Sequence, residues 1–262
     1  MFRHCIRGVL LLMPVGLVLC AGPSAQAGRR FGYSYESKTE KPGEVELENW
    51  VTWKTSKHND TSFDRLDFRH EVEFGVTKRL QLSYYFDWRY EDGSSVANDG
   101  ADFRDVAVEA IYNLADRKTQ PLGLALYGET KLGDELFELE GKVIVDKEVD
   151  NWLFAYNATI EAEWEGEGFG YDENKGEFNQ TFGASVEVAD ELFLGIELLH
   201  EVDFDSYSMT GHNVLYVGPN LAFEVEPEGG HEWWATITPL FQVTDVSDEP
   251  DFQVRLIFGF EF

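Results

Sequence analysis

The chain has 262 residues, of which 49 are acidic and 21 are basic, so its formal net charge is −28. This excess of negative charge argues against nucleic acid as a partner, because nucleic acid binding needs a basic surface. The hydrophobic share of 43% and the aromatic share of 15% argue against disorder, and the length allows a single domain.

The N-terminal segment has the pattern of a secretory signal peptide. Arg3 and Arg7 precede an apolar run, and Ala27 ends the small-residue pattern of a cleavage site. We therefore expect residues 1–27 to be removed after export through the inner membrane. Acylation at Cys20 is the alternative, although the residue before it is not small, as lipoprotein sites usually require.

Residues 28–42 form a separate segment that precedes the first regular pattern. Phe31, Tyr33 and Tyr35 make this segment too aromatic for a disordered tail. The sequence leaves three roles open: a plug inside the structure that the rest of the chain forms, an extension of its first strand, or a periplasmic segment.

Residues 43–262 show apolar side chains at every second position. One such run is Leu80, Leu82, Tyr84, Phe86, Trp88 and Tyr90, which alternates mostly with polar residues. A period of two predicts strands that have one apolar face. The pattern recurs and predicts about twelve strands of about 10–13 residues, which is near the length that a tilted strand needs to cross a bilayer.

Short and long connections alternate between these predicted strands along much of the chain, as do the periplasmic turns and outer loops of membrane barrels. The short break at Gly133 is an exception. We predict an all-β fold, a transmembrane antiparallel up-and-down β-barrel with both termini in the periplasm. A soluble β-sandwich is the alternative, but its strands usually have about 5–6 residues and need no aromatic girdles at their ends.

The chain ends in a strand of alternating aromatic residues, Phe258, Phe260 and Phe262. This ending resembles the C-terminal assembly signal of outer-membrane barrels, which implies that the barrel-assembly machinery is a partner. The segment from Arg30 to Glu36 and the following stretch to Trp53 resemble the start of an uncharacterised family of bacterial outer-membrane proteins. The resemblance implies a barrel in the outer membrane of a Gram-negative bacterium, in contact with lipid and lipopolysaccharide, but no established activity.

The alternation also predicts which charged side chains line the lumen. These are Glu46, Glu48, Asp67, Arg69, Glu71, Glu73, Asp87, Arg89, Glu109, Glu129, Lys131, Glu138, Glu140, Lys142, Glu161, Glu163, Glu197 and Arg255. Acidic residues predominate, so an open lumen should favour cations and reject anions. In the alternative, the carboxylates pair with basic residues inside a plugged barrel.

Four aromatic residues fall on the same inward face: Trp50, Tyr85, Tyr127 and Trp234. In a pore such rings could stack against a sugar or a nucleoside. The plainer interpretation is that they fill gaps in a narrow lumen.

No pattern indicates a catalytic residue, a resident metal or a cofactor. His70 and His200 fall on the apolar face, where we expect interfacial positions rather than catalysis. Acidic residues cluster in three predicted outer loops: Asp99, Asp102 and Asp105; Asp172 and Glu173; Asp245, Asp248, Glu249 and Asp251. Such carboxylates could bind Ca²⁺, but none of the loops has the full EF-hand pattern, so we expect solvated charged loops.

Three functions follow from these observations. The leading hypothesis is a narrow passive channel that favours small cations or neutral solutes. The second is a closed structural or adhesive barrel whose outer loops bind a surface partner. The third, an outer-membrane hydrolase, has the least support, and we expect no enzymatic activity.

Overall fold

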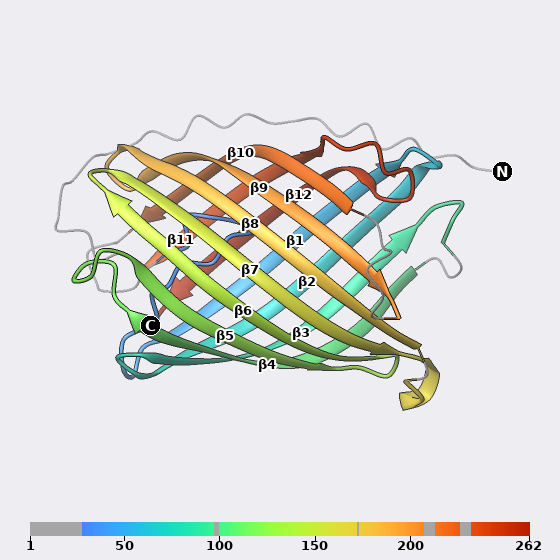
Figure 1. Cartoon of the computed structure of the whole chain (residues 1–262), viewed down its shortest axis with the longest axis horizontal. Coiled ribbons are helices and arrows are strands. Elements are labelled where there is room, and N and C mark those ends of the chain that lie inside the picture. Colours follow the sequence, from blue (N-terminus) through green and yellow to red (C-terminus); the bar gives the residue numbers. More distant parts are fainter. Residues whose placement is uncertain (1–27, 97–99, 172, 207–212, 226–231) are drawn as a thin grey trace.

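The structure is a computed structural model that describes residues 28–96, 100–171, 173–206, 213–225 and 232–262. Twelve antiparallel strands close into one barrel, in which each strand pairs with its neighbours in the sequence and β1 pairs with β12 (Figure 1). The predicted up-and-down barrel of twelve strands is therefore confirmed. Within the described ranges, no helix is both long and apolar enough to cross a membrane.

The strands contain 10 to 18 residues. They are β1 Val45–Lys57, β2 Asp60–Thr77, β3 Leu80–Asp92, β4 Gly100–Ala115, β5 Gly123–Leu132, β6 Leu136–Val149, β7 Trp152–Glu165, β8 Glu173–Ala189, β9 Leu192–Asp205, β10 Asn213–Val225, β11 Trp233–Gln242 and β12 Pro250–Glu261, with a short 3₁₀ helix, η1 Glu167–Phe169, before β8. β2, β4 and β8, with 18, 16 and 17 residues, exceed the predicted length most, because backbone pairing continues past the apolar run and does not require apolar side chains.

The two faces of the sheet differ as the alternation predicts. In β3, Leu82, Tyr84 and Phe86 are exposed on the outside, whereas Ser83 and Tyr85 are buried inside. Outward aromatic residues also meet across strands near the barrel ends, as Trp88 meets Phe103 with ring centroids 5.4 Å apart. A closed sheet with an apolar outer face suits a bilayer, because closure leaves no edge strand without a partner.

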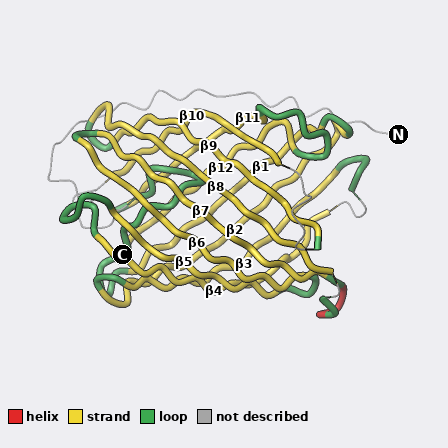
Figure 2. The backbone as a smooth tube through the Cα atoms, in the orientation of Figure 1, coloured by secondary structure: helices red, strands yellow, loops and turns green. Residues whose placement is uncertain are grey.

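The connections gather at the two ends of the barrel (Figures 1 and 2). One end, here called the terminal end, holds the short turns 78–79, 150–151 and 190–191 and the last residue, Phe262. The opposite end, here called the loop end, holds the connections that follow the odd-numbered strands. An even number of strands returns the chain to the end at which β1 began.

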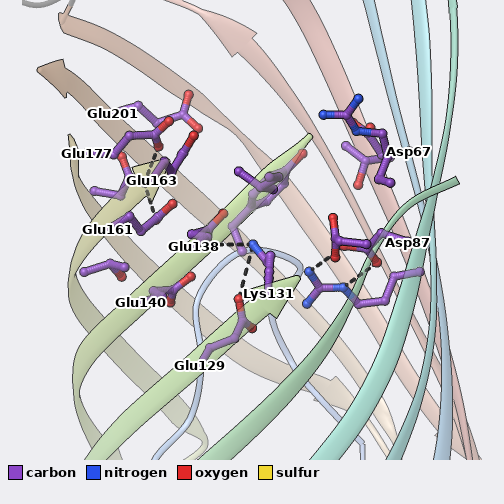
Figure 3. Close-up of a pocket in the computed structure, with 18 of the residues that line it drawn as sticks. Asp67, Asp87, Glu129, Lys131, Glu138, Glu140, Glu161, Glu163, Glu177 and Glu201 are labelled. Atoms are coloured by element: carbon purple, nitrogen blue, oxygen red, sulfur yellow. Dashed lines mark hydrogen bonds and ion pairs between the residues drawn. The ribbon is translucent and has the colours of Figure 1, made fainter. Parts of the chain in front are cut away.

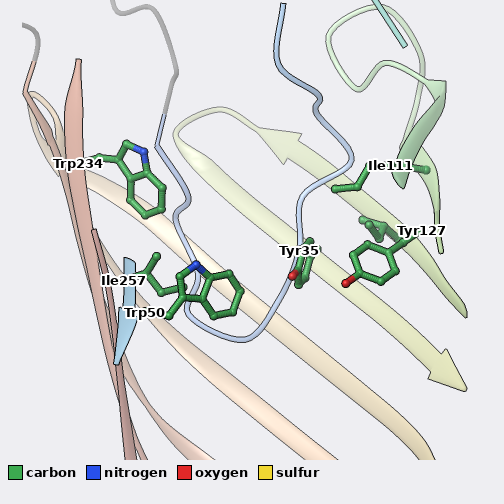
Figure 4. Packing of buried hydrophobic residues seen from close by; sticks show 8 residues of the cluster. Tyr35, Trp50, Ile111, Tyr127, Trp234 and Ile257 are labelled. Carbon is green, nitrogen blue, oxygen red and sulfur yellow. The ribbon is translucent and has the colours of Figure 1, made fainter. Parts of the chain in front are cut away.

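Residues 29–40, here called the plug, lie inside the barrel rather than along its edge. Phe31, Tyr33 and Tyr35 are each at most 7% exposed. Tyr35 packs in a cluster with residues of the wall, among them Trp50 and Tyr127 (Figure 4). The plug leaves the lumen at the terminal end, where the Glu40 amide donates to the Gln81 side chain (2.9 Å). Of the three roles that the sequence leaves open for this segment, the structure shows the plug inside the barrel.

Phe31 approaches the wall closely at one position of β8. A Cβ atom added to Gly183 would lie 2.6 Å from two carbons of the Phe31 ring. Since real Cβ contacts are longer than this, the absence of a side chain at Gly183 makes room for the plug.

We expect the substitution Gly183→Val to destabilise the folded barrel by about 1–3 kcal/mol, because it overpacks a tight contact. The matched control is Gly128→Val, since a Cβ atom there meets nothing within 4 Å. Urea unfolding in lipid vesicles, followed by tryptophan fluorescence, compares the two variants. Equal unfolding midpoints for both would show that Phe31 does not pack against Gly183.

Candidate functional site in the barrel lumen

The plug divides the lumen into two cavities of very different size. The larger, part of whose lining is drawn in Figure 3, has a volume of about 600 Å³. Tyr33 and Tyr35 of the plug contribute to its lining. The smaller, of about 30 Å³, lies beside the plug and is lined by Arg29 and Glu40, among other residues. The candidate functional site is therefore a large polar chamber with the plug at its floor.

The structure assigns the eighteen predicted lumen residues to three locations. Twelve line the large cavity: Asp67, Arg69, Asp87, Arg89, Glu129, Lys131, Glu138, Glu140, Lys142, Glu161, Glu163 and Arg255. Three line the small cavity: Glu46, Glu48 and Glu73. The other three are buried: Glu71, Glu109 and Glu197.

The wall formed by β2 and β3 is balanced in charge. Arg69 contacts both carboxylate oxygens of Asp87, at 3.1 and 3.2 Å. Asp67 lies between Arg65 (2.9 Å) and Arg89 (2.8 Å). Each of these carboxylates therefore faces a guanidinium that satisfies its charge.

The wall formed by β7, β8 and β9 lacks this balance. Glu161, Glu163, Glu177 and Glu201 gather on one side of the cavity (Figure 3), and within the described residues none of them lies within 4.0 Å of a basic side chain. Asn179 donates to Glu161 (2.8 Å) and Glu177 (3.1 Å). The chamber therefore has a strongly acidic side opposite an arginine-rich side.

The strand register also aligns carboxylates across neighbouring strands. Following paired positions from β1 to β9, and passing through Ser83 on β3, gives an acidic row of eight residues: Glu46, Glu73, Glu109, Glu129, Glu140, Glu161, Glu177 and Asp203. Because the strands of a barrel are tilted and staggered, such a row climbs along the barrel axis. It begins near the terminal end, at the second residue of β1, and finishes near the loop end of β9.

The four inward aromatic residues are at most 6% exposed. Three have a cation over the ring, since Arg69 lies 3.6 Å from the centroid of Tyr85, Lys142 lies 4.0 Å from that of Tyr127, and Arg29 lies 4.7 Å from that of Trp50. Trp50 packs against Tyr35 of the plug, with ring centroids 6.4 Å apart. These rings fill the lumen beside the plug and offer no open face for a sugar.

The plug is anchored most strongly at Glu197 on β9. This fully buried carboxylate accepts hydrogen bonds from three consecutive backbone amides, those of Gly32 (2.6 Å), Tyr33 (2.9 Å) and Ser34 (3.0 Å). Thr238 also donates to it, at 2.8 Å. Hydrogen bonds to a charged acceptor are stronger than neutral ones, so this contact holds the deepest part of the plug.

Two further wall residues bind the plug backbone. Asn157 accepts from the amide of Tyr35 (2.6 Å) and donates to its carbonyl (3.0 Å). Asp146 accepts from the amide and the hydroxyl of Ser37, at 2.7 and 2.9 Å, and pairs with Arg117. The sequence prediction did not include these anchors, although the alternation that turns Tyr156 outward also turns Asn157 inward.

The histidines that the structure describes lie on the outer face of the barrel or in a connection. His70 and His200 lie on the outer face and contact Asn49 and Asn213, each at 2.7 Å. Ser56 precedes the exposed His58 by two residues, and its hydroxyl donates to Asp251 (2.8 Å). Within the described residues, the groups of carboxylates close enough to bind an ion include none of the loop acids; Asp99 and Asp172 lie outside the described residues.

The substitution Glu197→Gln should loosen the plug, because three amides lose a charged acceptor. Since the cysteines of the chain are Cys5 and Cys20, both within the expected signal peptide, Ser34→Cys supplies a single reporter thiol. We expect this thiol to react with a maleimide severalfold faster in the Glu197→Gln background. Glu201→Gln, on the same strand and facing the large cavity, is the control and should not change the rate. Equal rates in all three backgrounds would contradict the anchoring role.

An ion pair of the plug gives a second prediction. Burial raises the pKa of Glu36, but Arg117, at 2.8 Å, outweighs this effect together with Lys38, and the pKa falls from 4.5 to about 2. The ionised form is therefore favoured by folding, and its contribution is present above pH 4.5 and lost as the pH falls towards 2. Urea midpoints should differ between the native chain and Glu36→Gln at pH 7 and converge near pH 2; a difference that does not change with pH would contradict this.

Comparisons with known proteins agree with the fold. The family of unknown function DUF6662 matches residues 24–254. The search of curated protein sequences found no match. An outer membrane channel of Pseudomonas putida F1, described as COG4313, is similar in structure (TM-score 0.60, 11% identity, 86% of this chain and 98% of that chain). The NanC porin is also similar in structure (TM-score 0.53, 10% identity, 82% of this chain and 98% of that chain). So is the β domain of the Bordetella autotransporter BrkA (TM-score 0.50, 12% identity, 85% of this chain and 99% of that chain).

Proposed function

We propose that this chain, which belongs to the DUF6662 family of unknown function, is a channel of the bacterial outer membrane whose lumen favours small cations. The acidic row carries the proposal, because it extends between the two ends of the barrel. Rings and rows of carboxylates attract cations and repel anions in a confined lumen. Two structurally similar proteins are described as an outer membrane channel and a porin, which supports the channel class.

The acidic side of the large cavity would be the entrance for cations from the loop end. Glu161 and Glu177 belong to the acidic row, and Glu163 and Glu201 lie beside it. No basic side chain lies within 4.0 Å of these four within the described residues, so the ionised glutamates among them would give the chamber a negative potential that concentrates cations.

The plug would set the rate of passage. The space beside it has a volume of about 30 Å³, compared with about 600 Å³ in the chamber. The small cavity has room for about one or two water-sized particles. We therefore expect a low conductance and exclusion of solutes as large as a sugar.

Reversal potentials in planar bilayers with a KCl gradient test this proposal. The native chain should give a potential of cation-selective sign. Replacing Glu161, Glu163, Glu177 and Glu201 by Gln should lower the ratio of cation to anion permeability several-fold, because four charges leave the chamber.

The control for this experiment is Asp190→Asn, which removes a charge from an exposed turn outside the lumen. It should leave the permeability ratio unchanged. Anion selectivity of the native chain, or an equal ratio in the fourfold variant, would contradict the proposal.

A closed structural or adhesive barrel is the second candidate, and the anchored plug is the observation that favours it. Glu197, Asn157 and Asp146 hold the plug backbone from three different strands. A barrel that serves only as a scaffold would show no conductance, and its loops would bind a surface partner. The bilayer measurement therefore separates the two candidates.

A further inference from the structure

Three carboxylates lie together in the wall where it faces the plug. Glu48 on β1 is paired in register with Glu71 on β2, and Glu73 follows two positions further along β2 on the same face. One oxygen of each lies within 4.8 Å of the others. The three side chains belong to residues that are 2%, 2% and 6% exposed, so bulk water does not separate their charges.

The hydrogen bonds of this cluster are incomplete. Glu48 accepts from Arg29 (3.1 Å) and from the indole of Trp50 (2.6 Å). Glu73 accepts from Gln81 (2.5 Å). Neither carboxylate oxygen of Glu71 has a hydrogen-bond partner among the described residues. A buried carboxylate without a partner is unfavourable, so this position calls for a cation or a proton.

The charge and the space at the cluster both suit a cation. Three carboxylates and the guanidinium of Arg29 leave two negative charges, which a divalent cation would balance. Arg69 also acts on Glu71, but it is paired with Asp87. Glu109, which is also buried without a hydrogen-bond partner among the described residues, adds to the negative potential. Glu48 and Glu73 line the small cavity of about 30 Å³, which is large enough for an ion or a water molecule.

We propose that Glu48, Glu71 and Glu73 form a binding site for a divalent cation of the size of Ca²⁺. Ca²⁺ binds carboxylate oxygens at about 2.3–2.6 Å, so opposite ligands lie about 5 Å apart, whereas Mg²⁺ requires about 4 Å. The three oxygens lie within 4.8 Å of one another, so one ion of either kind could contact all three. Mg²⁺ usually keeps several water ligands, for which the small cavity of about 30 Å³ has little room, so the site favours Ca²⁺. Glu71, with both oxygens unpartnered, would be the bidentate ligand.

Such an ion would also fasten the plug to the wall. Arg29 of the plug donates to Glu48, and neutralising Glu71 and Glu73 relieves the repulsion on this side of the lumen. Glu73 also belongs to the acidic row, but ion binding at this site does not require conduction, because a closed barrel with this geometry would bind the ion equally well.

Terbium luminescence tests the site in the intact barrel, since Tb³⁺ substitutes for Ca²⁺ and the Trp50 indole touches a proposed ligand. Excitation of tryptophan should give saturable Tb³⁺ emission that Ca²⁺ reverses and Mg²⁺ reverses less well. Glu71→Gln and Glu73→Gln should each weaken Tb³⁺ binding at least about tenfold. The control is Asp190→Asn, a carboxylate of an exposed turn outside the lumen that belongs to none of the groups close enough to bind an ion, and it should bind as the native chain does.

A second measurement covers variants that fail to fold. The native barrel should unfold at a higher urea concentration in Ca²⁺ than in a chelator, and the folded Glu→Gln variants should lose this difference. Absence of saturable Tb³⁺ binding overturns the proposal. An equal Tb³⁺ affinity in the native chain and in Glu71→Gln also overturns it. So does a native urea midpoint that is the same in Ca²⁺ and in a chelator, because that result is expected if protons neutralise the cluster.

Discussion

Closure of the sheet between β1 and β12 is the constraint on which the rest of the structure depends. It gives every strand a hydrogen-bonded neighbour on both sides, and the register fixes the face on which each side chain lies. The outward face can then be apolar, as Leu82 and Phe86 are. The inward face must place its polar side chains in a narrow lumen, where each carboxylate needs water, a basic residue, a backbone amide or an ion.

The lumen meets this need differently along its length. In the chamber, arginines satisfy Asp67 and Asp87, and the opposite wall keeps unpaired glutamates in contact with the cavity. Deeper in the barrel, the plug supplies its own amides to Glu197. The plug therefore supplies hydrogen bonds that a carboxylate of the wall needs. The space that remains for passage beside it is narrow and lined by acidic residues.

Much of the barrel could be predicted from the sequence, because its signal is local. The period of two depends on neighbouring residues, so the strand number and the faces of residues such as Tyr84 and Tyr85 follow from short windows of sequence. The extra length of β2 did not follow, because its first residues, Asp60 to Arg65, are mostly polar and break the apolar alternation although they pair with β1.

The plug and the meeting of carboxylates could not be predicted, because both depend on distant contacts. Ser37 and Asp146 are 109 positions apart, and Tyr35 and Asn157 are 122 apart, so no local pattern links them. The acidic row likewise depends on the register of eight strand pairs. Sequence alternation does not fix this register, because a shift of two residues keeps every side chain on the same face.

The most direct test of the account compares the conductance of the native chain with that of a chain lacking residues 28–40. The account predicts a low, cation-selective conductance for the native chain. Removal of the plug should raise the conductance while the sign of the selectivity persists, because the acidic row belongs to the strands. A folded barrel that conducts no ions without its plug, or that conducts equally with and without it, would contradict the account.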